Sequence, residues 1–279
     1  MAREEENITK KMTRQSHKKM DEQLDCMDTS RLSSWRWVNP SFEEGEAWLM
    51  AHPKYIKKGI YLSDTPSKEV WRLPIPRGLG GINIIYKKYQ CLQNSIWERF
   101  QRSLAVNEAL NFAALKEIGV PVAEVLACGE TRHVGLLLEA YIVTKCIDNT
   151  YDGSVLTPSG SLWERTRLRM GFARNAMEHI AKIHLVGCYH SAFRAHKILF
   201  PKDCDENNPS LTWIDVANCQ FFPEIPMKLA IPKDLVHMFV DLRLSADEIK
   251  ELENHYLKFN PNCGYTVKTL WNAMVALKN

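Results

Sequence analysis

The chain has 279 residues, of which 45% are hydrophobic and 25% charged, with only 13 glycines and 13 prolines. This composition is typical of a packed globular protein with one bilobal domain or two small domains, and it excludes a disordered or collagen-like chain. The formal net charge of +3 comes from 36 basic and 33 acidic residues, which is too balanced for a protein that gains its affinity by neutralising many phosphates. We therefore expect no nucleic-acid partner.

Residues 1–34 are polar, carry charges of both signs and lack the apolar core of a secretory signal. We expect them to form a mobile tail, and we expect the chain to be cytoplasmic. The longest apolar stretch, residues 135–143, contains Glu139 and is too short to cross a bilayer. The eight cysteines form no Cys-x-x-Cys pair, which argues against a zinc site or a dithiol redox site.

The first elements expected along the chain are a short helix and a hairpin. Ser41 and Glu44 have the spacing of a capping box, in which each side chain satisfies a backbone amide at the start of a helix. Residues 68–73 and 82–89 are extended in character and predict two strands.

Three glycines, Gly78, Gly80 and Gly81, lie between these two strands. A flexible backbone there could bring N–H groups close to a phosphate, but a plain hairpin turn explains the same glycines, and both interpretations stay open. The missing Gly-Lys-Ser/Thr excludes a Walker loop, and the lack of a following helix excludes a dinucleotide fingerprint.

One helix and two more strands complete the first half. Apolar residues between 103 and 118 follow an approximate helical stripe, and Gly119 supplies the stop. Residues 122–130 and 134–145 then predict two strands. The first half is therefore expected to be α+β, with a small sheet and one helix.

The second half is expected to be mostly helical. Two further capping boxes, Ser161 with Glu164 and Ser245 with Glu248, predict the starts of two helices. Between these helices, residues 198–200 and 211–214 are apolar runs too short for helices, and they predict a small hairpin.

Several polar residues in these elements could carry chemistry. Because side chains alternate along a strand, one of Lys87 and Lys88 must face inward, and Glu108 on the next helix is the nearest anionic partner in sequence. Both lysines could equally reach solvent near a strand end. His190 has a satisfied core histidine as its simplest interpretation. Asp215 ends the second apolar run, where a carboxylate can hold a metal or cap a turn.

The order of these features is more specific than any one of them. A glycine turn, a strand lysine, a helix glutamate, a histidine-led loop and a strand-end aspartate follow the order of a protein-kinase-like fold. The segments EALNFAALKEIGVPVAEVLACGE, IAKIHLVGCYHSAFRAHKILF and LTWIDVANC resemble the bacterial lipopolysaccharide core kinases, the heptose and Kdo kinase family. The resemblance covers roughly residues 68–260. It implies an N-lobe at 35–145, a helical C-lobe at 146–279 and a cleft between them.

The same resemblance implies ATP and Mg²⁺ as cofactors and a sugar hydroxyl of the lipopolysaccharide inner core as phosphate acceptor. It also suggests at most peripheral contact with the inner membrane. Lys87, preferred over Lys88 because Ile85 two residues earlier suits an adenine pocket, would hold the α and β phosphates. The glycine turn, with Gly78, Gly80 and Gly81, would contact phosphate, and Glu108 would pair with the lysine. Asp215 would bind Mg²⁺, and Asp234 would anchor the catalytic loop from a helix start.

The catalytic loop departs from the family pattern. Where the family has His-Arg-Asp-Phe, this chain has His190, Ser191, Ala192 and Phe193, so an alanine stands at the position of the proton acceptor. Five residues further on, Lys197 stands at a position for a metal ligand, and a cation repels Mg²⁺. We therefore place Lys197 against a phosphate, as a partial replacement for the charge of the metal.

Two functions follow. The chain is either a lipopolysaccharide-family kinase with weak or lost catalysis, or a catalytically silent pseudokinase that acts as a binding or regulatory module. In the first case, a basic surface could position the substrate, although a solvated helix face is the simpler explanation. That surface consists of Arg165, Arg167, Arg169 and Arg174.

Overall fold

The structure is a computed structural model that describes residues 34–65, 68–90, 95, 97–190, 193–221 and 227–278. These residues form two compact units, each described here by itself. The sheet unit comprises 34–113 and 123–148, and the helical unit comprises 114–122 and 149–278. The main division between the units falls after Asp148, whereas the sequence predicts a boundary after residue 145. Of the expected polar tail, only Ser34 is among the described residues.

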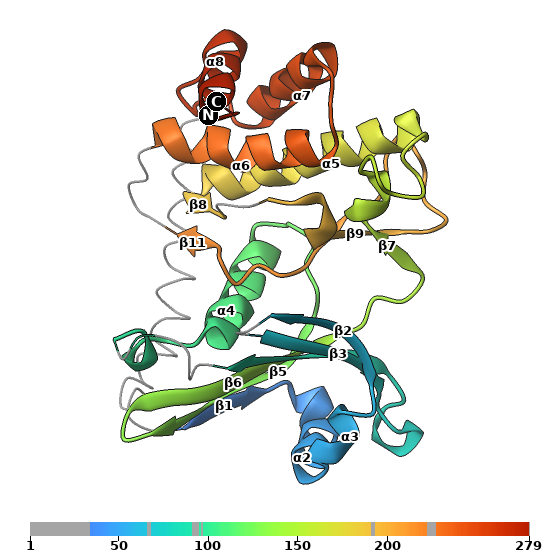
Figure 1. The fold of residues 1–279 in the computed structure, drawn as a ribbon, viewed down its shortest axis with the longest axis vertical. Coiled ribbons are helices and arrows are strands. Elements are labelled where there is room, and N and C mark those ends of the chain that lie inside the picture. Colours follow the sequence, from blue (N-terminus) through green and yellow to red (C-terminus); the bar gives the residue numbers. More distant parts are fainter. Residues whose placement is uncertain are drawn as a thin grey trace. The chain divides into compact units, whose positions relative to one another are not determined.

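The sheet unit contains an antiparallel sheet of six strands in the order β1-β5-β6-β4-β3-β2 (Figure 1). The strands are β1 (Trp35–Val38), β2 (Ile60–Thr65), β3 (Lys68–Pro74), β4 (Asn83–Gln90), β5 (Val125–His133) and β6 (Leu136–Lys145). The four central strands are those that the sequence predicts. The two edge strands, β1 and β2, are not predicted, because an edge strand has less buried surface to impose an alternating pattern. In β2, three consecutive apolar residues, Ile60, Tyr61 and Leu62, are exposed.

Two helices cover one face of this sheet, α2 (Glu43–Ala51) and α3 (Pro53–Ile56). Leu49 and Ile56 of these helices belong to the same buried core as the strand residues Trp71 and Tyr86. The capping box predicted at Ser41 and Glu44 is wrong. Asn39 caps an earlier 3₁₀ turn, η2 (Pro40–Phe42), by accepting the backbone N–H of Ser41, because Pro40 favours the first position of a helical turn.

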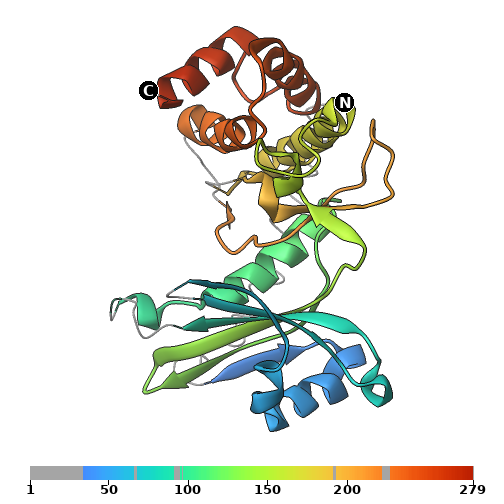
Figure 2. The same cartoon turned by 45° about the vertical axis from the view of Figure 1, so that its right-hand side comes forward.

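The opposite face of the sheet carries α4 (Leu104–Glu117), visible beside the strands in Figure 2. The helix bounds agree with the predicted segment, and Gly119 follows with φ +75°, the left-handed conformation that ends helices. Ser103 begins the helix because its hydroxyl accepts the backbone N–H of Val106 at 3.2 Å. Thus α4 starts at a capped and buried position.

The helical unit is built around α5 (Thr166–Leu185), which packs against α7 (Ala246–Phe259), while α6 (Met227–Asp241) packs against α8 (Val267–Lys278). The helices lie together in Figure 1. The capping box predicted at Ser161 is wrong, because α5 begins only at Thr166, after a series of turns, and its N-cap residue makes no side-chain cap. The box of Ser245 and Glu248 is confirmed, with both reciprocal hydrogen bonds present.

Short strands line the loops of the helical unit. The predicted hairpin is confirmed as β9 (Ile198–Pro201) paired antiparallel with β10 (Thr212–Trp213), and β7 (Thr150–Asp152) adds a third strand. A second pair joins β8 (Cys188–Tyr189) to β11 (Gln220–Phe221). These pairs hold the segments that carry His190 and Asp215.

In the part of the chain that the structure describes, none of the helices combines the length and apolar character needed to cross a membrane.

Candidate functional site

In the sheet unit, a lysine of the central strand β4 pairs with a glutamate of α4. Nζ of Lys87 lies 2.7 Å from Oε1 of Glu108, and the hydroxyl of Tyr89 donates to Oε2 at 2.7 Å. Lys87 and Tyr89 share a face because they are two residues apart on one strand. The Glu108 side chain is 1% exposed, so both of its oxygens are satisfied inside the protein. The predicted ion pair is therefore present.

The register also distinguishes the two neighbouring lysines. Lys88 points to the other face of β4 and pairs with Glu139 at 2.5 Å, where both side chains are part-exposed. An exposed pair of this kind contributes little to stability, whereas the buried Lys87 needs the Glu108 carboxylate to compensate its charge. Lys87 is thus the lysine that meets the α4 glutamate.

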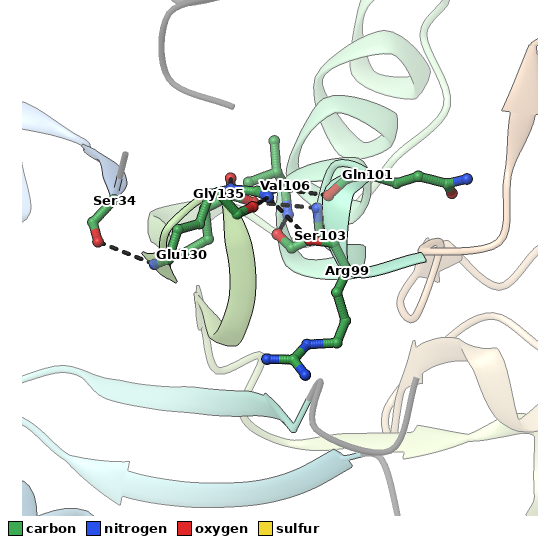
Figure 3. Close-up of polar contacts among 8 residues, drawn as sticks. Ser34, Arg99, Gln101, Ser103, Val106, Glu130 and Gly135 are labelled. Carbon is green, nitrogen blue, oxygen red and sulfur yellow. Dashed lines mark hydrogen bonds and ion pairs between the residues drawn. The ribbon is translucent and has the colours of Figure 1, made fainter. Parts of the chain in front are cut away.

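A buried ion pair on β5 fixes the start of α4 (Figure 3). Nε of Arg132 donates to Oε1 of Glu130 at 2.7 Å, and their side chains are only 1% and 6% exposed. Oε2 of Glu130 accepts the backbone N–H of Ser103 at 3.2 Å, and the Ser103 hydroxyl caps the helix. The glutamate therefore connects β5 directly to the helix that carries Glu108.

The guanidinium of Arg132 also donates to three backbone carbonyls. These carbonyls belong to Gln101 at 2.7 Å, Gly135 at 2.8 Å and Arg99 at 3.2 Å. Figure 3 shows Gln101, from the segment before α4, close to Gly135 of the β5–β6 turn. Arg132 therefore joins two backbone segments that are far apart in sequence, and it holds α4 in the position that brings Glu108 to Lys87.

The glycine turn does not join this cluster. Gly78, Gly80 and Gly81 connect β3 to β4 at the end where Pro74 pairs with Asn83, whereas Lys87 pairs with Val70 toward the other end. Lys87 lies four positions after Asn83 along the strand, a distance of about 13 Å at roughly 3.3 Å per residue. Gly80 and Gly81 have φ of 110° and 63°, so a tight turn between strands explains these glycines. The turn near Lys87 is instead the one between β2 and β3, part of which lies outside the described residues.

In the helical unit, the structure brings together three residues that the sequence singled out. Lys197 ends a 3₁₀ turn, η6 (Ala195–Lys197), and its Nζ lies 3.8 Å from Oδ2 of Asp215. Nε2 of His190 lies 3.3 Å from the backbone carbonyl oxygen of Asp215. Since the backbone N–H of Ile214 also donates to the Lys197 carbonyl at 2.8 Å, the two segments are joined along the chain as well as through side chains.

A buried aspartate of α6 holds the loop that begins at His190. Oδ2 of Asp234 accepts the backbone N–H of His190 at 2.9 Å and lies 3.2 Å from Nε2 of His184. Nδ1 of His184 in turn lies 2.9 Å from the hydroxyl of Tyr256. The anchoring role expected for Asp234 is confirmed by this contact, but the residue sits well inside α6 and not at a helix start.

The charge state of His190 follows from its surroundings. Burial, together with the nearby Lys197 charge, lowers the pKa of His190 to about 4. The ring is therefore neutral at pH 7, which leaves Lys197 as its cationic neighbour in this cluster. Ala192, which stands two residues later at the position of the missing base, lies outside the described residues.

Asp215 has an unusual backbone. Its φ is +56°, the left-handed region that a non-glycine residue adopts at a cost. Such conformations persist only where the surroundings determine them, and they often mark functional sites. The contacts to His190 and Lys197 described above supply those surroundings.

The residues around Asp215 do not fit a Mg²⁺ ion well. Mg²⁺ is held by oxygen ligands, usually one or two carboxylates together with substrate phosphates and water. Within the described ranges, no group of three or more His, Cys, Asp or Glu side chains could hold a metal ion. More decisively, the ammonium group of Lys197 already lies beside the carboxylate that would bind the ion.

The basic surface of α5 is largely neutralised. Arg169 lies over the Trp163 ring at 4.2 Å and pairs with Glu248 at 3.2 Å. Arg174 pairs with Glu251 at 2.7 Å, and Arg165 pairs with a glutamate of the adjoining loop. These pairs favour a structural face over a site for an anionic substrate.

The sequence reasoning missed Tyr89, Glu130 and Arg132. A signal was available for the last two, because they lie two residues apart shortly after the apolar residues 125–128. Alternation places two opposite charges on one face of β5, where a buried pair is the natural outcome.

Comparison with known proteins identifies the family. Residues 86–256, more than half of the chain, match the model of the lipopolysaccharide kinase (Kdo/WaaP) family. No curated protein sequence matches the chain. Among solved structures, one described as WaaP in complex with acyl carrier protein matches with a TM-score of 0.60 and 17% identity, over 88% of this chain and 95% of that chain. The likeness confirms the expected α+β, kinase-like fold, and by the family match the chain belongs to the lipopolysaccharide kinase (Kdo/WaaP) family.

Proposed function

We propose that this chain binds ATP and that its transfer of phosphate to a sugar hydroxyl of the lipopolysaccharide inner core is weak or lost. The observation that supports the proposal is the buried pair of Lys87 and Glu108, because kinases hold their phosphate-binding lysine by such a pair with a helix glutamate. The glycines of the β3–β4 turn take no part in the proposed site.

The loss of catalysis is proposed from the residue at position 192. Phosphoryl transfer depends on positioning and charge neutralisation, with a carboxylate that orients the attacking hydroxyl and accepts its proton. The methyl group of Ala192 does neither. Removing a positioned acid or base commonly lowers the rate by about 10² to 10⁴.

ATP binding is tested by calorimetric titration of the whole chain. Lys87→Met is expected to weaken ATP binding by at least about tenfold, because an amine that contacts phosphate is lost. Lys88→Met is the matched control, since it removes the same charge from the adjacent residue on the other face of β4 and should leave the affinity unchanged. Equal affinities for the two variants would contradict the role of Lys87.

A catalytically silent binding or regulatory protein is the second candidate function. Lys197 beside Asp215 favours it, because a cation occupies the surroundings of a metal-binding acid. A phosphate-transfer assay on core oligosaccharide separates the two candidates. Slow transfer that disappears in Lys87→Met supports the weak kinase, whereas ATP binding without transfer supports the silent protein.

For the acceptor, we propose a lipid-linked sugar reached through peripheral contact with the membrane. Sedimentation of the chain with vesicles that contain core lipopolysaccharide tests this contact, with vesicles of neutral phospholipid as the control. Equal recovery from both kinds of vesicle would contradict it.

A further inference from the structure

A basic and apolar segment of the sheet unit, residues 54–62, lies where α3 leads into the edge strand β2 (Figure 1). Its three lysines, Lys54, Lys57 and Lys58, are all exposed. In the strand that follows them, Ile60 is 65% exposed and Leu62 is 50% exposed. The segment therefore presents three cations and two large aliphatic side chains to solvent within a short length of chain.

The exposure of the apolar side chains follows from a bulge in β2. The pairing of β2 with β3 shifts register between Tyr61 and Ser63, so Leu62 is an extra residue without an opposite residue in β3. Regular alternation would turn every second side chain inward, whereas Ile60, Tyr61 and Leu62 are all exposed. The Tyr61 ring also keeps a contact with the core, 5.6 Å from the Trp71 ring. Because a bulge disrupts the outer edge of a strand, it disfavours the addition of a strand from a second copy of the chain.

The three lysines of this segment lack compensating acids. Among the residues that the structure describes, none of the three forms an ion pair. The exposed acids Glu43 and Glu44 are in the first turn of α2, and the length of that helix, about 13 Å, separates them from Lys54. The segment thus carries a local positive charge, although the charge of the whole chain is nearly balanced.

Resting on the peripheral contact proposed above, we propose that residues 54–62 are the surface by which the chain binds an anionic lipid bilayer. The aliphatic side chains would enter the boundary between headgroups and acyl chains, and the lysines would contact anionic headgroups. Lysine is depleted in protein interfaces, and each side of a stable protein interface contributes roughly 20–30 residues, far more than this segment has. A lipid surface requires no matching shape, so it suits a short basic and apolar segment better than a protein partner does.

The location is tested on the natural chain by hydrogen exchange with vesicles that contain phosphatidylglycerol, with vesicles of phosphatidylcholine alone as the control. We expect slower exchange at residues 54–62 with the anionic vesicles only. Slower exchange around Trp97 and Val134 instead, which are exposed apolar residues of the same unit, would overturn the inference and leave the peripheral contact standing. Sedimentation with neither kind of vesicle would overturn both, while the proposed ATP binding would still stand or fall by calorimetry.

A pair of lysine substitutions measures the role of charge. Lys57→Gln with Lys58→Gln is expected to weaken binding to the anionic vesicles by at least about tenfold, because two cations that contact headgroups are lost. Lys88→Gln with Lys145→Gln is the matched control. It removes the same net charge from two lysines of the sheet unit that already pair with glutamates, and it should bind the vesicles like the natural chain. Equal losses from the two double variants would mean that only the net charge matters and would overturn the inference.

The apolar contribution is measured in the same way. Ile60→Thr with Leu62→Thr is expected to weaken vesicle binding by at least about fivefold, because less apolar surface leaves water. Threonine keeps the preference for an extended strand, and Val134→Thr is the control at another exposed position. Unchanged vesicle binding by the Ile60 and Leu62 variant would overturn the inference. A dimer of the natural chain that this variant abolishes, without vesicle binding, would assign the surface to a second copy and would also overturn it.

Discussion

The two units differ in how they treat the charged groups they bury. In the sheet unit, the buried acids Glu108 and Glu130 are each paired with a cation and hold a second donor. In the helical unit, Glu253 is fully buried, and its oxygens have no hydrogen-bond partner among the described residues. In the sheet unit, the buried acids around Lys87 and at the start of α4 are thus paired and hydrogen-bonded.

The helical unit is also where the chain departs from the family pattern. Asp234 accepts the backbone N–H of His190, while the resemblance to the family places Ala192 and Lys197 where a proton acceptor and a metal ligand are expected. Four predictions test this contrast, beginning with the largest expected effect.

The framework of the sheet unit is tested by Arg132→Met. This variant leaves Glu130 as a buried charge without its cation, so the free energy of unfolding should fall by about 3 to 5 kcal/mol. Chemical denaturation measures the change. Lys145→Met, which breaks an exposed pair at 3.9 Å in the same unit, is the control and should change stability by less than about 1 kcal/mol.

A double variant separates charge from packing at the same place. Adding Glu130→Met to Arg132→Met removes the unpaired charge and should recover much of the lost stability. Equal stabilities of the Arg132→Met chain and the natural chain would mean that the β5 pair does not hold the unit together.

The chemistry of the helical unit is tested by Ala192→Asp. If the absence of a proton acceptor limits catalysis, this variant should raise the rate of phosphate transfer by about 10² or more. Ala192→Asn is the control, because it adds a similar side chain that cannot accept the proton. Fast transfer by the natural chain would refute the proposed loss, and an inactive Ala192→Asp chain that binds ATP would show that more than the base is missing.

The unpaired acid of the helical unit predicts a pH dependence. Burial raises the pKa of Glu253 to about 7, whereas an unfolded glutamate titrates near 4.3. Its contribution to stability is therefore greatest below about pH 4.3, falls as the pH rises through about 7 and is constant above that. Glu253→Gln should remove this dependence and raise the free energy of unfolding at pH 8 by about 2 kcal/mol.

Denaturation of both chains between pH 5 and pH 8 measures this effect. Glu251→Gln changes an exposed neighbour on the same helix, which pairs with Arg174, and its stability should follow the pH dependence of the natural chain. Identical pH profiles for Glu253→Gln and the natural chain would contradict the assignment.

The smallest effect concerns two of the capping-box sequences. Ser245→Ala should lower the free energy of unfolding by about 1 kcal/mol, because both reciprocal hydrogen bonds of that box exist. Ser161→Ala should have almost no effect, since α5 begins elsewhere. Equal losses from the two variants would contradict the difference between the two helix starts.

The parts of the fold that the sequence predicted are those where a strong local pattern agrees with burial. The central strands, α4, α7 and the β9–β10 hairpin have such patterns, and their bounds agree with the structure within a few residues. Two of the three predicted capping boxes are wrong, because the Ser-x-x-Glu pattern also occurs where another feature sets the start of the helix. Asn39 caps a turn before the first helix, and a series of turns precedes α5. The edge strands lacked a pattern to detect.

For the candidate site, strand alternation predicted that one of Lys87 and Lys88 faces inward, and the choice of Lys87 came only with the family resemblance. Neither could place the glycine turn, because the position of a turn relative to a lysine depends on which strands pair and at which end. The contact of Lys197 with Asp215 joins residues on two different segments, and only the pairing of β9 with β10 brings them together.

The left-handed backbone at Asp215 restricts what can replace this residue. Glycine and asparagine adopt φ near +56° readily, whereas alanine and branched residues do so only with strain. An alanine scan at this position would therefore combine the loss of a carboxylate with a distorted loop. Sequence drift here should be confined to a few residue types even after all catalysis is gone, so an aspartate at this position is not by itself a sign of a working kinase.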